Sequence, residues 1–81
     1  MIKSISFSKT MSYILRYSYN DFNIKKDSEG YVDIDEFLIA LRKNFPKATI
    51  NDIRYWSEQK NKDGKLRFTI KENKIKANYI H

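Results

Sequence analysis

The strongest constraint on this chain is that it must fold within 81 residues without a single cysteine. A chain of that length forms one domain and buries only about 60–65% of the surface that its unfolded form exposes. Disulfides cannot reinforce so small a core, and zinc sites built on thiolates are excluded. We therefore expect residues 1–81 to form a single domain whose stability rests on its apolar side chains.

The ionisable residues exclude several classes of functional site. The one histidine, His81, is the last residue, so neither a histidine metal site nor a nucleophilic triad is available. Residues 25–36 are close to a calcium loop, but Lys25 stands where the first ligand should be Asp. No run of roughly 20 apolar residues is present to span a membrane. The sequence thus predicts a cytoplasmic protein with no bound metal and no membrane partner.

Positive charge is concentrated in the second half of the chain. Residues 1–40 contain five basic and six acidic residues, whereas residues 41–81 contain eleven basic and four acidic ones. The second half therefore carries a charge of +7 and the first half −1, which together give the net charge of +6. Such an excess favours a polyanionic partner, which can be RNA, DNA or an anionic surface. The alternative is a lysine-rich face that only keeps the chain in solution.

Apolar spacing and capping residues predict three helices. The first spans about Ser8 to Tyr19, the second follows the N-cap Asp33, and the third follows the N-cap Thr49. Glu36, three residues after Asp33, suits a capping box. Each helix has an apolar face with members three and four residues apart. These faces are Phe7, Met11, Ile14 and Leu15; Ile34, Phe37, Leu38 and Leu41; and Ile50, Ile53 and Trp56.

The last part of the chain alternates as a β-hairpin does. Apolar and polar residues alternate over residues 66–71 and again over 75–79, with a turn at residues 71–74. The polar positions would leave one face of the hairpin basic, with Arg67, Thr69, Lys71, Lys74 and Lys76 on it. Three helices plus a C-terminal β-hairpin make an α+β fold, the plan of a small winged-helix domain.

Four segments resemble the RNA 2′-phosphotransferase family, in the same order over nearly the whole chain. Residues 12–17 are similar to the family's Ser-Tyr-Ile-Leu-Arg-His segment, and residues 27–38 to its Asp-x-x-Gly-Trp-Val-x-Val-Asp-x-Leu-Leu run. Residues 66–68 resemble its Lys-Arg-Phe, and residues 75–81 its Ile-Arg-Ala-Asn-Gln-Gly-His. Each match is weak alone, and the four together are specific.

The resemblance implies a function connected with RNA. The family transfers a 2′-phosphate from an RNA splice junction, as in tRNA splicing, to NAD through an ADP-ribosylated RNA intermediate. Its N-terminal lobe is a winged helix that binds the RNA phosphate, and its C-terminal lobe holds NAD. This chain resembles the first lobe only. We therefore expect it to bind RNA, with 2′-phosphorylated RNA as a candidate ligand, and not to catalyse the reaction alone. NAD would be involved only if a separate transferase lobe exists.

The resemblance also assigns residues to an RNA-phosphate site. Arg16 and Arg67 match arginines that would clamp the 2′-phosphate, which suits the bidentate fork of a guanidinium. Tyr17 departs from the family's histidine, since a phenol donates one hydrogen bond but carries no positive charge near neutral pH. The expected site residues are Arg16, Tyr17, Lys65, Arg67, Lys76 and the terminal His81.

Four functions remain open at this point. The first is a stand-alone RNA-binding module, with Tyr17, Tyr19 and Trp56 as candidates for base stacking. The second is a fragment of an active 2′-phosphotransferase, against which the missing histidine counts. The third is a reader of double-stranded DNA that places its third helix in a major groove. The fourth is a protein-binding or self-associating module, which would tolerate salt and the loss of Arg16, unlike an RNA site.

Overall fold

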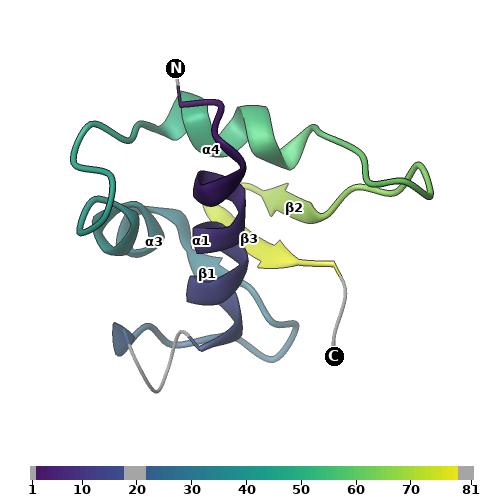
Figure 1. Ribbon diagram of the computed structural model, residues 1–81. Coiled ribbons are helices and arrows are strands. Elements are labelled where there is room, and N and C mark those ends of the chain that lie inside the picture. The colour runs from purple at the N-terminus through teal and green to yellow at the C-terminus, as the bar shows by residue number, and fades with distance from the viewer. Residues whose placement is uncertain (1, 18–21, 79–81) are drawn as a thin grey trace.

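The computed structural model describes residues 2–17 and 22–78 of the chain (Figure 1). Within these residues the fold is α+β, with three helices and a three-stranded antiparallel sheet. None of these helices is both long and apolar enough to cross a membrane. The elements are α1 (Ile5–Arg16), β1 (Val32–Asp33), α3 (Ile34–Leu41), α4 (Ile50–Ser57), β2 (Phe68–Lys71) and β3 (Lys74–Ala77).

The strands lie in the order β1-β3-β2, with β3 in the centre. The predicted hairpin is confirmed, since β2 and β3 pair across a turn that begins at Lys71 and ends at Lys74. The prediction of only two strands was wrong, because Val32 and Asp33 of β1 pair with the other edge of β3. A strand of two residues is too short to show the alternation by which strands are recognised in a sequence.

One inward position of the hairpin was also predicted wrongly. Leu66 was expected to face the core with Phe68, but it is 43% exposed. It lies in the loop before β2, where it forms an isolated bridge with Lys60. Regular strand pairing begins only at Phe68, which is the buried residue of β2; Thr69 and Ile70 are partly buried and Lys71 is exposed.

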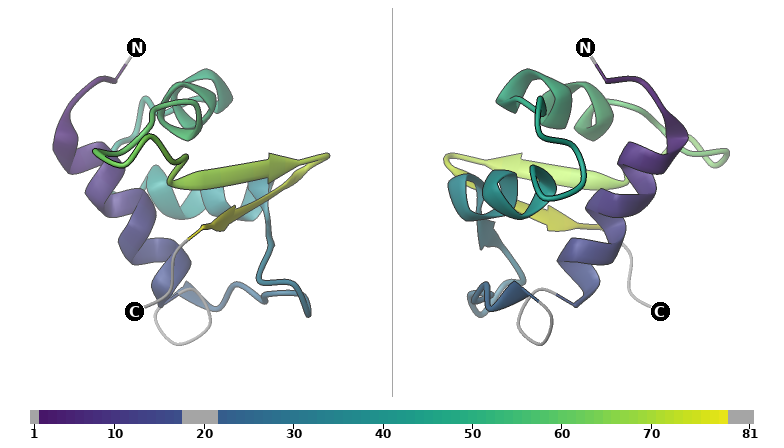
Figure 2. Two further views of the ribbon diagram at one scale, coloured as in Figure 1. Left: turned by 90° about the vertical axis from the view of Figure 1, so that its right-hand side faces the viewer. Right: turned by 60° about the vertical axis from the view of Figure 1, so that its left-hand side comes forward.

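Helix α1 lies across one face of the sheet, with α3 beside it and α4 near the edge formed by β2 (Figures 1 and 2). The space between these elements holds one hydrophobic core. The predicted apolar faces of the first two helices are confirmed, since all of their members are buried. In the third helix Ile53 is buried, and Ile50 and Trp56 are partly buried against the same core.

The predicted N-caps of the second and third helices are confirmed. Asp33 Oδ2 accepts a hydrogen bond from the amide of Glu36 at 3.0 Å, and Thr49 Oγ1 accepts one from the amide of Asp52 at 3.3 Å. The start predicted for α1 was three residues late. Its first residue, Ile5, is 67% exposed and does not belong to the apolar face, whose first member is Phe7, so the spacing of apolar residues does not mark where the helix begins.

Asp52 fastens the N-terminal residues to α4. Its buried carboxylate accepts hydrogen bonds from the backbone amides of Thr49 and Ile2, each at 2.8 Å. Trp56 strengthens the same attachment, because its indole N–H donates to the carbonyl of Ile2 at 3.0 Å. Burial alone would raise the pKa of the Asp52 carboxyl, but the hydrogen bonds from Ile2 and Thr49 outweigh it, and the pKa is lowered.

We expect Asp52 to contribute to loss of stability in acid. Because its pKa in the folded state lies below the ordinary 3.8, its contribution is present above that value and is lost as the pH falls through the folded-state pKa. Asp52→Asn should lower the free energy of unfolding at pH 7 by about 2 kcal/mol and flatten its fall in acid. Urea unfolding of both proteins at neutral and acidic pH tests this. An unchanged acid profile would contradict the assignment and point to another carboxylate, such as Asp27, whose pKa the backbone amide of Tyr31 lowers.

Candidate nucleic-acid interface

Arg67 reaches back from the residue before β2 to the side of α1. Its Nη1 donates to Ser8 Oγ at 2.8 Å, and its Nη2 donates to Ser12 Oγ at 3.2 Å. Because the two serine hydroxyls accept from different nitrogens of Arg67, they fix both the plane and the direction of its guanidinium. The expectation that Arg67 points outward with the hairpin lysines was wrong. Arg67 lies in a bend outside β2, so the alternation of a strand does not govern where its side chain points.

Arg16 lies on the same strip of α1. Ser8, Ser12 and Arg16 are four residues apart, so they follow one another along one side of the helix at intervals of about 6 Å. Because Arg67 is bound to Ser8 and Ser12, its guanidinium lies between about one and two helical turns from Arg16 along the helix. Two arginines that are far apart in the sequence thus share one side of the molecule.

Ser8 and Ser12 are contributors that the sequence reasoning missed. Ser8 is fully buried, and it lies between Phe7 and Met11 near the apolar face of α1. A hydroxyl buried in such a place needs a hydrogen-bond partner. That requirement was the available signal, but the sequence does not reveal that the partner is a residue 59 positions away.

Tyr17 lies at the end of α1 within a group of rings. Its ring centroid is 5.6 Å from the guanidinium carbon of Arg16 and 4.8 Å from the ring of Tyr13. Tyr13 in turn meets Phe22 edge to face, with the ring centroids 6.0 Å apart. We call Tyr13, Tyr17 and Phe22 the aromatic cluster. Tyr13 was not among the predicted stacking residues, although its four-residue spacing from Tyr17 would have placed the two rings together.

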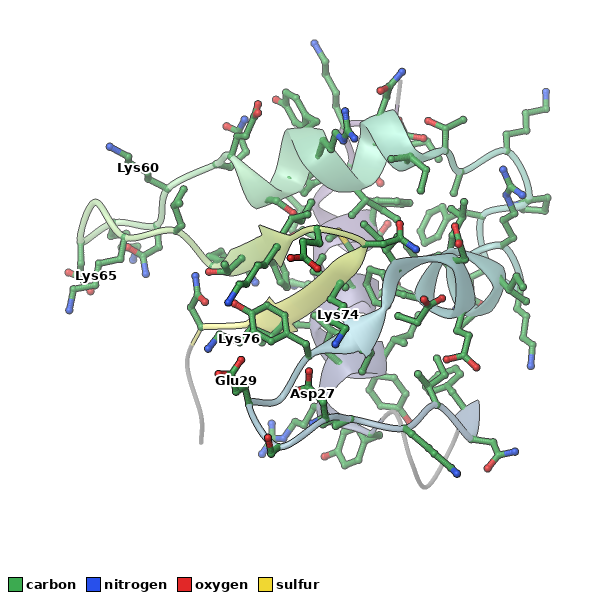
Figure 3. All side chains as sticks on the ribbon, turned by 180° about the vertical axis from the view of Figure 1, so that it is seen from behind. Asp27, Glu29, Lys60, Lys65, Lys74 and Lys76 are labelled. Carbon is green, nitrogen blue, oxygen red and sulfur yellow. The ribbon has the colours of Figure 1, made fainter. Side chains whose placement is uncertain are left out.

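The predicted lysines lie elsewhere. Lys76 is on the face of the sheet turned away from α1, where its Nζ lies 5.0 Å from the ring centroid of Tyr31 (Figure 3). Its neighbour Lys74 forms an ion pair with Asp27 at 3.4 Å. Lys65 is exposed in the loop between α4 and β2, which is shaped by hydrogen bonds to the side chain of Asn61 (Figure 3). The structure therefore groups Arg16, Tyr17 and Arg67 but places Lys76 on another face.

His81 and Tyr19 lie outside the residues that the structure describes. Trp56 is partly buried and donates its indole N–H to the backbone of Ile2, so it holds the fold together.

One hollow among the described residues has a lining that does not suit NAD. This hollow, near the start of α4, is bounded by a buried carboxylate, that of Asp52, which already accepts hydrogen bonds from Ile2 and Thr49. A carboxylate at this place would repel the pyrophosphate of a dinucleotide. Nor do residues 2–17 and 22–78 contain a group of three or more metal-ligating side chains placed to hold an ion. The residues that line the hollow are Ile2, Lys47, Thr49, Asn51 and Asp52.

Comparison with known proteins identifies the family. The model of the RNA 2′-phosphotransferase, Tpt1 / KptA family matches residues 3–81. Probable RNA 2′-phosphotransferases of Pyrococcus abyssi and Pyrococcus horikoshii are 43% and 45% identical over 74 residues, which are 91% of this chain but 39% and 40% of those proteins. The probable RNA 2′-phosphotransferase of Acetivibrio thermocellus is 31% identical over 83 residues, which cover 100% of this chain and 44% of that protein.

Two facts follow from these matches. The chain spans about two fifths of the length of the curated relatives it matches. The family match also includes Arg16 and Arg67, on which the resemblance depended, and Ser8 and Ser12, which hold Arg67. The resemblance read from four short segments is thus confirmed over nearly every residue, and the chain belongs to the RNA 2′-phosphotransferase family.

Proposed function

We propose that this chain is a single winged-helix domain that binds an RNA phosphate between Arg16 and Arg67. The winged-helix assignment is supported by the order of elements, in which three helices precede a hairpin and a short strand joins that hairpin from the region before α3. RNA is the proposed ligand because the relatives are named for acting on it. The observation that carries the proposal is the pair of hydrogen bonds that hold Arg67 to α1 beside Arg16.

The chemistry of this arrangement suits a phosphate monoester. A guanidinium has five N–H donors, and Ser8 and Ser12 accept from two nitrogens of Arg67, which leaves further donors for an anion. Since the serines orient Arg67 before any ligand arrives, less conformational freedom is lost on binding. Arg16 would supply a second charge, and the phenol of Tyr17 one hydrogen-bond donor.

The other predicted residues take secondary parts in this proposal. Lys65, exposed near Arg67 in the chain, would contact a neighbouring phosphate as a point charge. Lys76, on the opposite face of the sheet, would contribute only to longer RNAs that pass around the hairpin. His81 stays a proposed phosphate contact on the strength of the resemblance alone.

A salt titration tests the proposal. The ligands are a short single-stranded RNA with one internal 2′-phosphate and the same RNA without it. We expect the phosphorylated RNA to bind about 100-fold more tightly, because a charge-assisted hydrogen bond contributes about 1.5–3 kcal/mol and the 2′-phosphate would accept from two arginines. If about three phosphates are neutralised, the logarithm of the affinity should fall with the logarithm of salt with a slope of about −2. Equal affinities for the two RNAs would contradict a phosphate site.

The matched control for this titration is Arg54→Ala. Arg54 is an exposed arginine on α4, whose removal changes the net charge by the same amount as the removal of Arg16 or Arg67. We expect this variant to keep the preference for the phosphorylated RNA.

The length of the relatives favours a second candidate function. Because the chain matches about two fifths of those proteins, it could serve as the RNA-binding part of a longer RNA 2′-phosphotransferase. NAD would then be bound by the part of such a protein that this chain does not match. If this chain alone transferred the 2′-phosphate to NAD, the proposal that it is only the RNA-binding part would be contradicted.

A further inference from the structure

An exposed stripe on α1 combines aromatic rings with positive charge. Ile5, Lys9, Tyr13 and Tyr17 follow one another at four-residue intervals, and all four are exposed. Successive residues of a helix are about 100° apart around its axis, so this stripe runs directly beside Ser8, Ser12 and Arg16. α1 contains no acidic residue. The rings therefore lie next to the proposed phosphate site, in a region of positive charge.

Tyr13 is the best-placed ring of this stripe. It is 49% exposed, yet other rings restrain it on two sides. The ring of Tyr17 lies 4.8 Å away at an angle of 47°, and Phe22 meets it edge to face at 87°. Phe22 is itself packed against the hydrophobic core, so the cluster is anchored. A restrained ring loses little conformational freedom when a ligand binds to its exposed part.

We infer that Tyr13, with Tyr17 beside it, stacks an unpaired nucleobase next to the phosphate held by Arg16 and Arg67. This inference rests on the proposed function and deepens it, because it specifies single-stranded RNA as the ligand. Aromatic side chains stack bases of any sequence, since every base has a π face. In a duplex those faces are covered by neighbouring base pairs, so only a base splayed out of a single strand or loop can reach the ring.

The composition of the stripe favours RNA over a protein as its occupant. Two of its three apolar members are aromatic, and the cations Lys9 and Arg16 flank Tyr13. Lysine is depleted at protein–protein interfaces, whereas rings placed among cations are typical of surfaces that bind single-stranded nucleic acid. Tyr13 also directly follows Ser12, which holds Arg67, so a base and its adjacent phosphate could be bound together.

The test uses two single-stranded RNAs, each with one internal 2′-phosphate and one fluorescent base, 2-aminopurine, in an adjacent nucleotide. The aminopurine lies on the 5′ side of the 2′-phosphate in the first RNA and on the 3′ side in the second. Abasic versions of the same RNAs are the comparison ligands. We expect at least one aminopurine to be quenched on binding, and its abasic counterpart to bind about tenfold more weakly. Tyr13→Leu should abolish the quenching and bind the intact and abasic RNAs equally.

Two further variants separate stacking from other effects. Tyr13→Phe keeps the ring and should behave like the wild type, whereas a hydrogen-bonding role of the hydroxyl would make it behave like Tyr13→Leu and overturn the inference. Tyr55→Leu removes a tyrosine of α4 and should leave the quenching and the abasic penalty intact. Urea unfolding of each variant confirms that it is folded under the conditions of the binding assay.

The outcomes distinguish the two proposals. Phosphate-dependent binding with no abasic penalty would overturn the stacking inference and leave the proposed function standing. An abasic penalty that depends on Tyr13, without any preference for the 2′-phosphate, would support stacking and overturn the phosphate site. A Tyr13→Leu variant that weakens binding of intact and abasic RNA alike, with the abasic penalty unchanged, would overturn the inference.

Discussion

Replacing Arg67 by alanine is expected to weaken binding of 2′-phosphorylated RNA by about 100-fold at low salt, while binding of the unphosphorylated RNA changes little. The size follows from the loss of a charged, hydrogen-bonded partner that is oriented in advance, for which about 2–5 kcal/mol is typical. Arg67→Lys should recover only part of the affinity, since an ammonium on a flexible stem cannot bind Ser8, Ser12 and a phosphate in one plane. Fluorescence anisotropy with both RNAs measures these effects.

The same substitution has a consequence for stability that must be separated from binding. Arg67→Ala leaves the buried hydroxyl of Ser8 without the donor seen in the structure, which costs about 1–3 kcal/mol. The double variant Ser8→Ala, Arg67→Ala removes that hydroxyl too and should regain part of the lost stability, measured by urea unfolding. If the double variant regains stability and also regains RNA affinity, Arg67 acts only through the fold and the phosphate site is wrong.

Phe37→Ala is expected to lower the free energy of unfolding by about 3–5 kcal/mol. Phe37 is fully buried on α3, and truncation of a core phenylalanine removes its transfer free energy and leaves a cavity. A protein of this size has a total stability of about 4–12 kcal/mol, so the variant should be close to unfolded at physiological temperature. The measurement is urea unfolding followed by circular dichroism, with Phe37→Leu as a milder variant that stays folded.

The matched control for Phe37 is on the same helix. Ile39 is 64% exposed, so Ile39→Ala should change the free energy of unfolding by less than about 0.5 kcal/mol. Equal losses from Phe37→Ala and Ile39→Ala would mean that α3 does not pack by the face described above.

Most of the helical fold could be predicted because its signals are local. The apolar members of α3 recur every three or four residues, and Asp33 and Thr49 bond to amides only three residues away. What could not be predicted depends on distant partners. The attachment of Ile2 to Asp52 and the pairing of β1 with β3 join residues 50 and about 40 positions apart, and no periodicity encodes such contacts.

In the candidate site too, some residues could be predicted from the sequence and others could not. Arg16, Tyr17 and Arg67 were singled out by resemblance to a family, and their role in binding phosphate stays a prediction. The resemblance did not reveal how Arg67 is held, because its partners Ser8 and Ser12 lie 59 and 55 positions earlier in the chain and meet it only in the folded protein. Lys76 was grouped with Arg67 by alternation along a hairpin, which fails where the strand has not yet begun.

The central position of β3 determines when this chain can fold on a ribosome. Residues 74–77 supply the only strand that joins β1 to β2 in the described sheet, and Ile75 is fully buried in the core. Until those residues have left the exit tunnel, the helices made before them have no completed sheet to cover, and their apolar faces stay open to chaperones. At about 5–20 residues per second, translation of the chain up to this strand takes several seconds, during which folding cannot be completed.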